Sequence, residues 1–342
     1  MSLDTEVLIA GGGPVGLAAG IEARMAGLDV TVVEPRDGPI DKACGEGLMP
    51  GALPELARLG IDPDGMPFHG IAYTDGTRRI EHRFDGGPGR GVRRTVLHAA
   101  LRDRAVAAGV RFHEGRVDAV HQRAGFVEAV GLRAAWLLGA DGLHSAVARE
   151  VGLALPPPRG RRRFGQRRHY ALPPWSEFVE VLWTPAGEFY VTPVADRVVG
   201  VALLARRGEH FDEALGVAPG LAERLRGVEA ASELRGAGPL RQRTLARVAG
   251  RVLLVGDASG YVDALTGEGL RIGFAQARAA VAAIDADRPK DYEAAWERET
   301  RDFRRLTGAL VRLASSPLRG AVVPAASRLP GVFAGAVERL AR

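Results

Sequence analysis

The chain has 342 residues, of which 46% are hydrophobic and 25% are charged, a composition typical of a soluble globular protein with a large core. No apolar run approaches the ~20 residues of a membrane span, and a predicted strand starts the chain, so we expect neither a span nor a secretory signal. The net charge is +5, but no nucleic-acid-binding motif accompanies it, so we expect no nucleic-acid partner. A single cysteine, Cys44, excludes an internal disulfide and favours a cytoplasmic protein.

The first motif is a glycine-rich turn near the start of the chain. A short apolar run precedes the turn and predicts a buried strand, and residues 15–26 after it have the length and alanine content of a helix. Gly11, Gly13 and Gly16 have the G-x-G-x-x-G spacing that permits a tight turn, approach of a pyrophosphate and close helix packing. A second predicted strand ends at Glu34, about 20 residues further on, where a carboxylate suits ribose hydroxyls. These features predict a dinucleotide site.

The rest of the chain alternates predicted strands and helices. In chain order we expect a loop over 35–55, short strands within 68–94, a helix over 96–108, strands over 110–113 and 117–138, strands over 160–205, a helical stretch over 208–235, a buried strand within 250–260, and helices over 267–286 and 291–314. The strand-rich stretch over 160–205 predicts an antiparallel sheet that forms a second lobe.

Two further glycine-rich turns follow predicted strands. The stretch GADGLHSAV contains Asp141 and Gly142, and the stretch LLVGDASGYVDALTGEGL contains Gly256 and Asp257. Ligands of open α/β sheets bind where strands end in such turns, so three distant turns predict a cofactor longer than one nucleotide. The Asp257 carboxylate can accept hydrogen bonds from sugar hydroxyls, although an Asx-turn or a helix cap is the alternative. The segment TGEG at 266–269 opens the next helix, and its N–H groups can face the anionic edge of a reduced cofactor.

The three motifs, in this order, resemble the flavoprotein family that includes p-hydroxybenzoate hydroxylase and geranylgeranyl reductases, over most of residues 1–290. The resemblance implies an α/β fold: a Rossmann-like FAD-binding domain of the p-hydroxybenzoate hydroxylase type with an antiparallel β-sheet substrate lobe. It implies extended FAD, with adenine near Glu34 and the isoalloxazine between the lobes. Arg94 matches the arginine that begins the family's helix beside the flavin, and Asp257 matches the acid at the ribityl and pyrophosphate groups.

The resemblance gives expected domains and site residues. The FAD-binding domain would comprise 1–67, 95–158 and 246–290, the substrate lobe 68–94 and 159–245, and C-terminal helices 291–342. The expected cofactor-binding residues are Gly11, Gly13, Pro14, Val15, Gly16, Glu34, Pro35, Arg36, Cys44, Gly45, Arg94, Val117, Asp141, Gly142, Gly256, Asp257, Gly267, Glu268, Gly269 and Leu270. No residue is assigned a catalytic role, and no metal site is predicted.

Cys44 lies in the segment KACGEGL, which resembles a cysteine–glycine loop of the geranylgeranyl reductase branch. With TGEG, it places the chain closer to that branch than to the phenol hydroxylases. We expect Cys44 to contact the flavin without thiol chemistry, because one unpaired cysteine cannot cycle as a dithiol. Flavin halogenases share the fold, but this chain lacks their lysine and their W-x-W-x-I-P segment, so halogenation is not expected.

Two other stretches have an ordinary and a functional interpretation. The arginine cluster over 159–168 is either a solvated surface or a site for the 2′-phosphate of NADPH or an acidic carrier protein. His169, Tyr170, Trp175, Trp183 and Tyr190 follow it, as core residues or as the lining of an aromatic pocket. At the C-terminal end, Leu318, Val322, Leu329, Phe333, Val337 and Leu340 predict one apolar side of a helix pair broken by Pro324 and Pro330. We expect this side to pack on the body rather than on a membrane.

We therefore expect an FAD-dependent oxidoreductase. The leading hypothesis is a single-component monooxygenase that uses O₂ and a flavin C4a-hydroperoxide to hydroxylate an aromatic or polyketide-like small molecule of secondary metabolism. The alternative is a geranylgeranyl reductase-like enzyme that reduces isoprenoid C=C bonds, and a second alternative is a flavin-binding protein without turnover. No second G-x-G-x-x-G follows a strand, so NADPH or NADH would be a transient electron donor.

Overall fold

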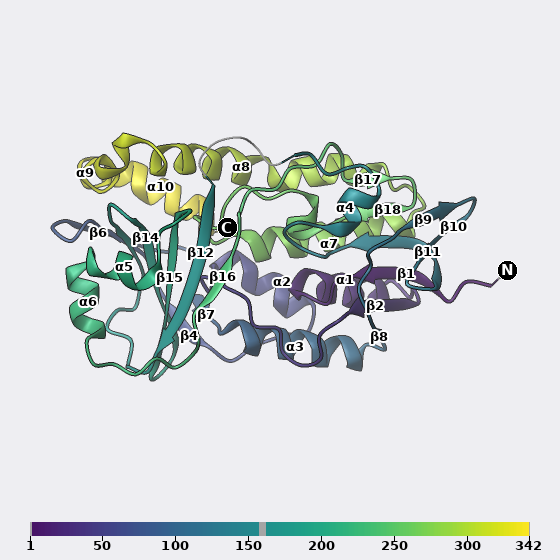
Figure 1. Ribbon diagram of the computed structural model, residues 1–342, viewed down its shortest axis with the longest axis horizontal. Coiled ribbons are helices and arrows are strands. Elements are labelled where there is room, and N and C mark those ends of the chain that lie inside the picture. Colours follow the sequence, from purple (N-terminus) through teal and green to yellow (C-terminus); the bar gives the residue numbers. More distant parts are fainter. Residues whose placement is uncertain (1, 157–161, 342) are drawn as a thin grey trace.

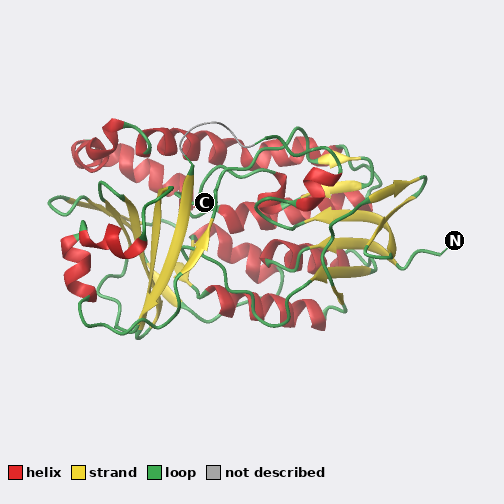
Figure 2. Ribbon diagram, in the orientation of Figure 1, coloured by secondary structure: helices red, strands yellow, loops and turns green. Residues whose placement is uncertain are grey.

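Two β-sheets stand at opposite ends of a layer of helices (Figure 1 and Figure 2). The computed structural model describes residues 2–156 and 162–341. The first sheet contains β1 (Thr5–Ala10), β2 (Val30–Glu34), β8 (Arg111–Glu114), β9 (His121–Arg123), β10 (Phe126–Ala129), β11 (Leu132–Gly139), β17 (Val248–Ala249) and β18 (Val252–Leu254). Its central strands β18-β11-β1-β2-β8 are all parallel, with β1 in the middle.

The sequence of β1 is apolar because both faces of the sheet are covered. Val7 and Ile9 pack into one core with helices α1, α3 and α7, while Leu8 and Ala10 pack into a second core on the opposite face. Successive side chains of a strand point to opposite faces, so a strand covered on both sides reads as a continuous apolar run. The carboxyl ends of these parallel strands face the second lobe, where the predicted glycine-rich turns begin.

The second sheet has the order β16-β12-β15-β14-β13-β5-β6. Its strands are β5 (Gly70–Thr74), β6 (Arg79–Arg83), β12 (Arg163–Tyr170), β13 (Val179–Trp183), β14 (Gly187–Ala195), β15 (Val198–Arg206) and β16 (Arg235–Ala237). All neighbouring strands are antiparallel except β5 and β13, which are parallel. A third, small sheet contains β3 (Gly47–Leu48), β4 (Met66–Phe68) and β7 (Gly89–Gly91). The predicted α/β fold with a largely antiparallel lobe is confirmed.

The helices of the described residues are α1 (Pro14–Met25), α2 (Leu53–Arg58), α3 (Arg94–Ala107), α4 (Ala146–Glu150), α5 (Phe211–Gly216), α6 (Pro219–Leu225), α7 (Gly269–Asp285), α8 (Asp291–Ala314), α9 (Val322–Arg328) and α10 (Pro330–Ala341). Three 3₁₀ turns join them, η1 (Pro50–Ala52), η2 (Gly256–Ser259) and η3 (Pro317–Ala321). Helix α8 runs along the molecule, and α9 lies at the end opposite the N-terminus (Figure 1).

Three local expectations are wrong in part. The loop over 35–55 contains β3 and η1, and α2 begins within it; the stretch over 208–235 holds only the short helices α5 and α6 before β16. At the C-terminal end, Phe333, Val337 and Leu340 are buried as expected, but Leu318 is 65% and Leu329 is 57% exposed. The breaks at η3 and before Pro330 interrupt the helical repeat, so one periodicity does not run through the whole segment.

No single helix of the described chain is long and apolar enough to cross a membrane, although the bent pair 317–328 and 330–341 passes the test of length and composition together.

Candidate active site

A cavity of about 670 Å³ lies between the two sheets. Every predicted cofactor-binding residue except two lines its wall. The two exceptions are Gly16 and Glu268. The turns after β1, β11 and β18 therefore meet at one cavity, as expected from their place at the ends of parallel strands.

The first turn is shaped by its glycines. Gly11 has φ +105°, and a Cβ there would lie 2.6 Å from the backbone oxygen of Ala140. A Cβ on Gly16 would lie 1.9 Å from the Gly11 backbone oxygen, so this glycine allows α1 to pack against the turn. At Gly13, by contrast, a Cβ would meet no described atom within 4 Å, because this position opens on the cavity. Backbone approach to a phosphate requires such an opening.

Glu34 is fixed at the end of β2 beside this turn. Its Oε2 accepts a hydrogen bond from the Gly12 N–H at 2.9 Å, and its Oε1 lies 2.7 Å from Nε of Arg36. The carboxylate is buried but lines the cavity. Each carboxylate oxygen has more than one acceptor site, so Glu34 retains capacity for ribose hydroxyls.

Two buried polar atoms beside the cavity lack a partner within the described part of the chain. They are Oδ1 of Asp141 and Nε of Arg94. The other Asp141 oxygen accepts from the Val147 N–H at 3.1 Å and fixes the carboxylate at the start of α4. Buried polar atoms are nearly always hydrogen-bonded, so these two point to a polar ligand. The donor and acceptor set of the cavity therefore fits FAD.

Asp257 lies at the start of η2 and lines the same cavity. Burial raises the pKa of its carboxyl group, and the positive charges of Lys42 and Arg94 oppose that rise. Lys42 was not predicted as a site residue. The sequence feature that could have drawn attention to Lys42 is its rarity, because it is one of only two lysines among many arginines.

Helix α7 begins at Gly269, so the TGEG segment opens a helix as predicted. Gly267, with φ +72°, and Gly269 line the cavity and bring the N-terminus of α7 to it. Glu268 instead forms an ion pair with Arg271 at 2.7 Å. Its side chain therefore does not line the cavity, and its role in cofactor binding, which was expected through the backbone N–H groups of TGEG, stays a prediction.

A buried pair that sequence reasoning missed adjoins the Cys44 loop. Nε2 of His169 on β12 lies 2.6 Å from Oε2 of Glu46, and both side chains are at most 2% exposed. Oε1 of Glu46 accepts from the Arg94 N–H at 2.8 Å, and Glu46 lines the cavity. Nδ1 of His169 lies 2.9 Å from Oγ of the half-buried Ser232. Cys44 also lines the cavity and accepts from the Glu46 N–H at 3.4 Å.

The arginine cluster is a solvated surface only in part: Arg162 is exposed and Arg168 half-buried, whereas Arg163 and Arg167 are buried. Arg163 pairs with Glu188 at 2.6 Å and with Asp263 at 3.1 Å, and Arg167 pairs with Asp41. Arg163 and Arg167 occupy alternate positions of β12 that share one face of the sheet, and both side chains are buried. Because each is paired with carboxylates, neither is free for a nucleotide phosphate or a carrier protein. Arg159 and Arg161 lie outside the described residues.

The cavity continues from the cofactor turns along the second sheet, where its wall is apolar. This part is lined by Phe68, Ile71, Tyr73, Val179, Val181, Tyr190, Ala202, Leu204, Leu240, Leu265, Val337 and Leu340. Of the aromatic side chains considered from the sequence, only Tyr190 lines it. Trp183 packs in the core 5.6 Å from the ring of Tyr73, while Tyr170 and Trp175 belong to a core that includes α5 and α6.

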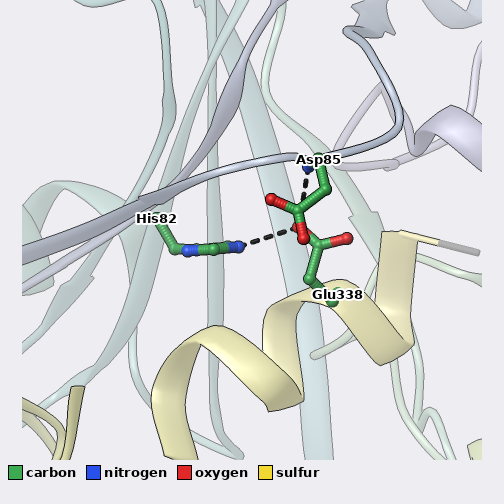
Figure 3. A group of neighbouring side chains, drawn as sticks. All are labelled: His82, Asp85 and Glu338. Carbon is green, nitrogen blue, oxygen red and sulfur yellow. Dashed lines mark hydrogen bonds and ion pairs between the residues drawn. The ribbon is translucent and has the colours of Figure 1, made fainter. Parts of the chain in front are cut away.

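Helix α10 closes the apolar part and is tied to the sheet by Glu338. Its Oε1 lies 2.8 Å from Nε2 of His82 on β6 and accepts from the Asp85 N–H at 3.0 Å (Figure 3). The three side chains gather closely enough to resemble a metal site. These two hydrogen bonds explain Glu338 as the residue that ties α10 to the sheet, and nothing else in the described structure points to an ion.

Comparison with known proteins places this arrangement in a family. The model of the family described as FAD binding domain matches residues 4–286. The chain belongs to this family. It is 30% identical to a menaquinone reductase of Mycolicibacterium smegmatis over 86% of this chain and 80% of the relative. It is 28% identical to digeranylgeranylglycerophospholipid reductase 1 of Methanopyrus kandleri over 88% of each chain.

Other matches are shorter or more distant in sequence. The 6-methylpretetramide 4-monooxygenase of Streptomyces rimosus is 30% identical but over only 44% of this chain and 31% of its own. A variant of the flavin-dependent brominase Bmp2 superposes with a TM-score of 0.82 at 19% identity, over 98% of this chain and 94% of that one, which establishes the fold alone. The chain is an FAD-dependent oxidoreductase, and the two curated relatives reported above that match most of its length in sequence are reductases.

Proposed function

We propose that this protein reduces C=C bonds in the isoprenoid chain of a lipophilic molecule. The proposal reverses the order of the hypotheses drawn from the sequence, in which aromatic hydroxylation came first. Two of the relatives that cover most of the chain are reductases whose names refer to menaquinone and to a geranylgeranyl lipid. The monooxygenase named above matches less than half of the chain.

The observation that carries the proposal is the apolar wall that continues from the cofactor turns. Aliphatic side chains of three strands face it, among them Val181, Ala202 and Leu204, and α10 adds Val337 and Leu340. A prenyl chain has no polar group to match, so an elongated apolar wall is what such a substrate requires. A small phenolic substrate would favour convergent polar groups at the same place.

Bound FAD supplies the hydride chemistry, and NADH or NADPH is the proposed transient donor of electrons. The chain itself would hold the cofactor through the backbone at Gly11 and Gly13, the carboxylates of Glu34 and Asp257, and the N-terminus of α7, all of which line the cavity. That N-terminus carries partial positive charge, which stabilises an anionic flavin edge.

Reduction of a C=C bond adds a hydride to one carbon and a proton to the other. Glu46 lines the cavity, and its Oε2 shares a hydrogen bond with Nε2 of His169, which is linked through Nδ1 to Ser232. Glu46, His169 and Ser232 therefore form a series of contacts from the cavity to the half-buried Ser232. A proton can be held between Oε2 of Glu46 and Nε2 of His169. We propose that Glu46 supplies the proton and that His169 replaces it.

The test uses purified, FAD-loaded protein with NADH plus NADPH, menaquinone, a geranylgeranyl glycerol ether and a phenolic polyketide panel, under ¹⁸O₂. Products are read by mass spectrometry. A prenyl compound that gains two hydrogens without label supports the proposal. A phenolic product that carries one ¹⁸O instead supports the monooxygenase, and a flavin that no donor reduces supports a binding protein without turnover.

A further inference from the structure

The C-terminal end of the chain has an unusual charge pattern. Residues 303–337 hold five arginines and no aspartate, glutamate or lysine, although the whole chain is nearly balanced at 46 basic and 41 acidic residues. Arg305, Arg312 and Arg328 are exposed and have no hydrogen-bond or ion-pair partner among residues 2–156 and 162–341. The other two, Arg304 and Arg319, pair with Glu297 and Glu188, so three of the five arginines lack a described carboxylate partner.

The same segment exposes large apolar side chains. Leu318 in η3, Leu329 before α10 and Val332 in the first turn of α10 are 65%, 57% and 67% exposed. Both α10 and η3 contact α9, and α9 lies at the end of the molecule farthest from the N-terminus (Figure 1). We call this end, residues 317–332, the C-terminal tip. Water-exposed aliphatic side chains beside uncompensated arginines are the pattern of a surface that binds at a membrane interface.

The tip is held firmly to the body. The guanidinium of Arg319 donates to Glu188 at 2.9 Å and to the Pro185 carbonyl at 3.0 Å, and Glu188 also pairs with Arg163 on β12. Val322 and Val323 of α9 are buried in the core that includes Val337. The exposed leucines are therefore presented by an anchored segment rather than by a fraying terminus.

Helix α10 connects the tip with the cavity. Val332 is exposed in its first turn, whereas Val337 and Leu340 line the apolar wall. Eight residues of helix span about 12 Å, so the exposed and the cavity-lining side chains are close along one element. A prenyl chain that enters beside α10 would pass from an apolar surface to an apolar wall.

We propose that the C-terminal tip docks on an anionic lipid bilayer, with Leu318, Leu329 and Val332 in the interface and the exposed Arg312 and Arg328 at the headgroups. The choice of a bilayer over an acidic protein rests on the proposed function, because a polyprenyl substrate resides in a membrane. This proposal differs from the expectation drawn from the sequence, in which the whole apolar side of the C-terminal helix pair packs on the body of the protein. Arginines near an anionic surface add attraction that salt weakens.

The test is co-sedimentation of the FAD-loaded full chain with phosphatidylcholine vesicles, with and without phosphatidylglycerol. The wild-type protein should bind the anionic vesicles and bind neutral ones less, and added salt should weaken binding. The triple variant L318E/L329E/V332E should lose about tenfold or more in partitioning. The matched control V106E/V217E/L245E changes three side chains exposed by 56%, 50% and 64% elsewhere and should bind as the wild type does.

Charge is tested separately with R312Q/R328Q, which removes one exposed arginine of the tip and one in the last turn of α8 before it. The control R123Q/R197Q removes two exposed arginines from β9 and from the turn before β15. The R312Q/R328Q variant should bind anionic vesicles about tenfold more weakly and bind neutral vesicles as the wild type does.

Flavin content and thermal unfolding report whether each variant folds. Wild-type protein that stays in solution with anionic vesicles, or tip variants that bind like their folded controls, would overturn the proposal and leave an acidic protein as the partner of the tip. Because binding needs no turnover, vesicle binding without reduction of any prenyl compound would contradict the proposed function alone.

Discussion

Nε2 of His169 lies 2.6 Å from Oε2 of Glu46, although 123 positions separate the two residues in the chain. Both side chains are nearly inaccessible to water, and Glu46 lines the cavity one residue after Gly45. A buried acid and imidazole in contact are expensive to maintain unless they are paired and hydrogen-bonded. Here the Glu46 carboxylate also accepts from the Arg94 N–H, and Nδ1 of His169 contacts the Ser232 hydroxyl at 2.9 Å. Its position at the cavity wall links the substrate lobe to the cofactor turns.

Glu46→Gln keeps the shape of the side chain but removes its charge and its exchangeable carboxyl proton. We expect flavin content close to that of the wild type and a turnover number lower by about a hundredfold, with a flatter pH profile of kcat. Asp212→Asn is the control, since it removes another carboxylate paired with an arginine of β12, outside the cavity. A folded, flavin-loaded Glu46→Gln variant with wild-type turnover would exclude Glu46 as the proton donor.

Gly13→Val and Gly16→Ala separate cofactor binding from folding. A side chain at position 13 enters open space, so apoprotein stability should be unchanged while FAD affinity falls by about tenfold or more. A Cβ at position 16 lies 1.9 Å from the Gly11 backbone oxygen, so this variant should lose about 1–3 kcal/mol of unfolding free energy. Thermal unfolding of the apoproteins and titration with FAD distinguish the two. Equal losses of stability in both variants would contradict the assignment.

The Asp263 carboxyl group makes stability depend on pH. Burial raises its pKa from 3.8 to about 6, although Arg163 opposes the rise. An acid with a higher pKa in the folded chain stabilises the fold below its unfolded pKa, and that contribution is lost as the pH rises through the folded pKa.

The unfolding free energy of the wild type, relative to that of Asp263→Asn, should therefore fall by up to about 3 kcal/mol as the pH rises from 3.8 to about 6. Urea unfolding followed by tryptophan fluorescence measures the difference at each pH. A difference that stays constant over this range would mean that Asp263 ionises normally in the folded protein.

Val337→Phe tests the apolar wall. Val337 is buried on α10 and lines the cavity, so the larger ring should shorten the space for a prenyl chain without reaching the cofactor turns. We expect unchanged flavin content and a KM for geranylgeranyl substrates higher by about tenfold, with a smaller effect on geranyl substrates. If chain length makes no difference to the effect, the substrate chain does not lie against α10.

The sequence predicts the cofactor side of the molecule well because its signals are local. The turn at Gly11, the helix that begins at Gly269 and the helix over 291–314 all lie within a few residues of their predicted places. In each case the spacing of apolar residues and glycines determines a single turn, strand or helix locally. The parallel sheet then brings the carboxyl ends of its strands together.

The substrate side is harder because its features depend on tertiary contacts. Arg163 and Arg167 look like a solvated charge run until β12 places them on the inward face opposite Glu188 and Asp41. The partner of His169 lies in the Cys44 loop and cannot be inferred from spacing. The exposure of Leu329 follows from a break between helices whose bend angle is 102°, which periodicity does not encode.

The central claim is that electrons from FAD reach a C=C bond. The most direct measurement mixes anaerobically reduced enzyme with a geranylgeranyl glycerol ether, which lacks a quinone ring that could itself take the electrons, and follows flavin absorbance. The account predicts that the oxidised flavin spectrum returns without O₂ and that the lipid gains two hydrogens per flavin. Flavin that stays reduced with the lipid and reoxidises only when O₂ is admitted, with oxygen transferred to a phenolic substrate, would contradict it.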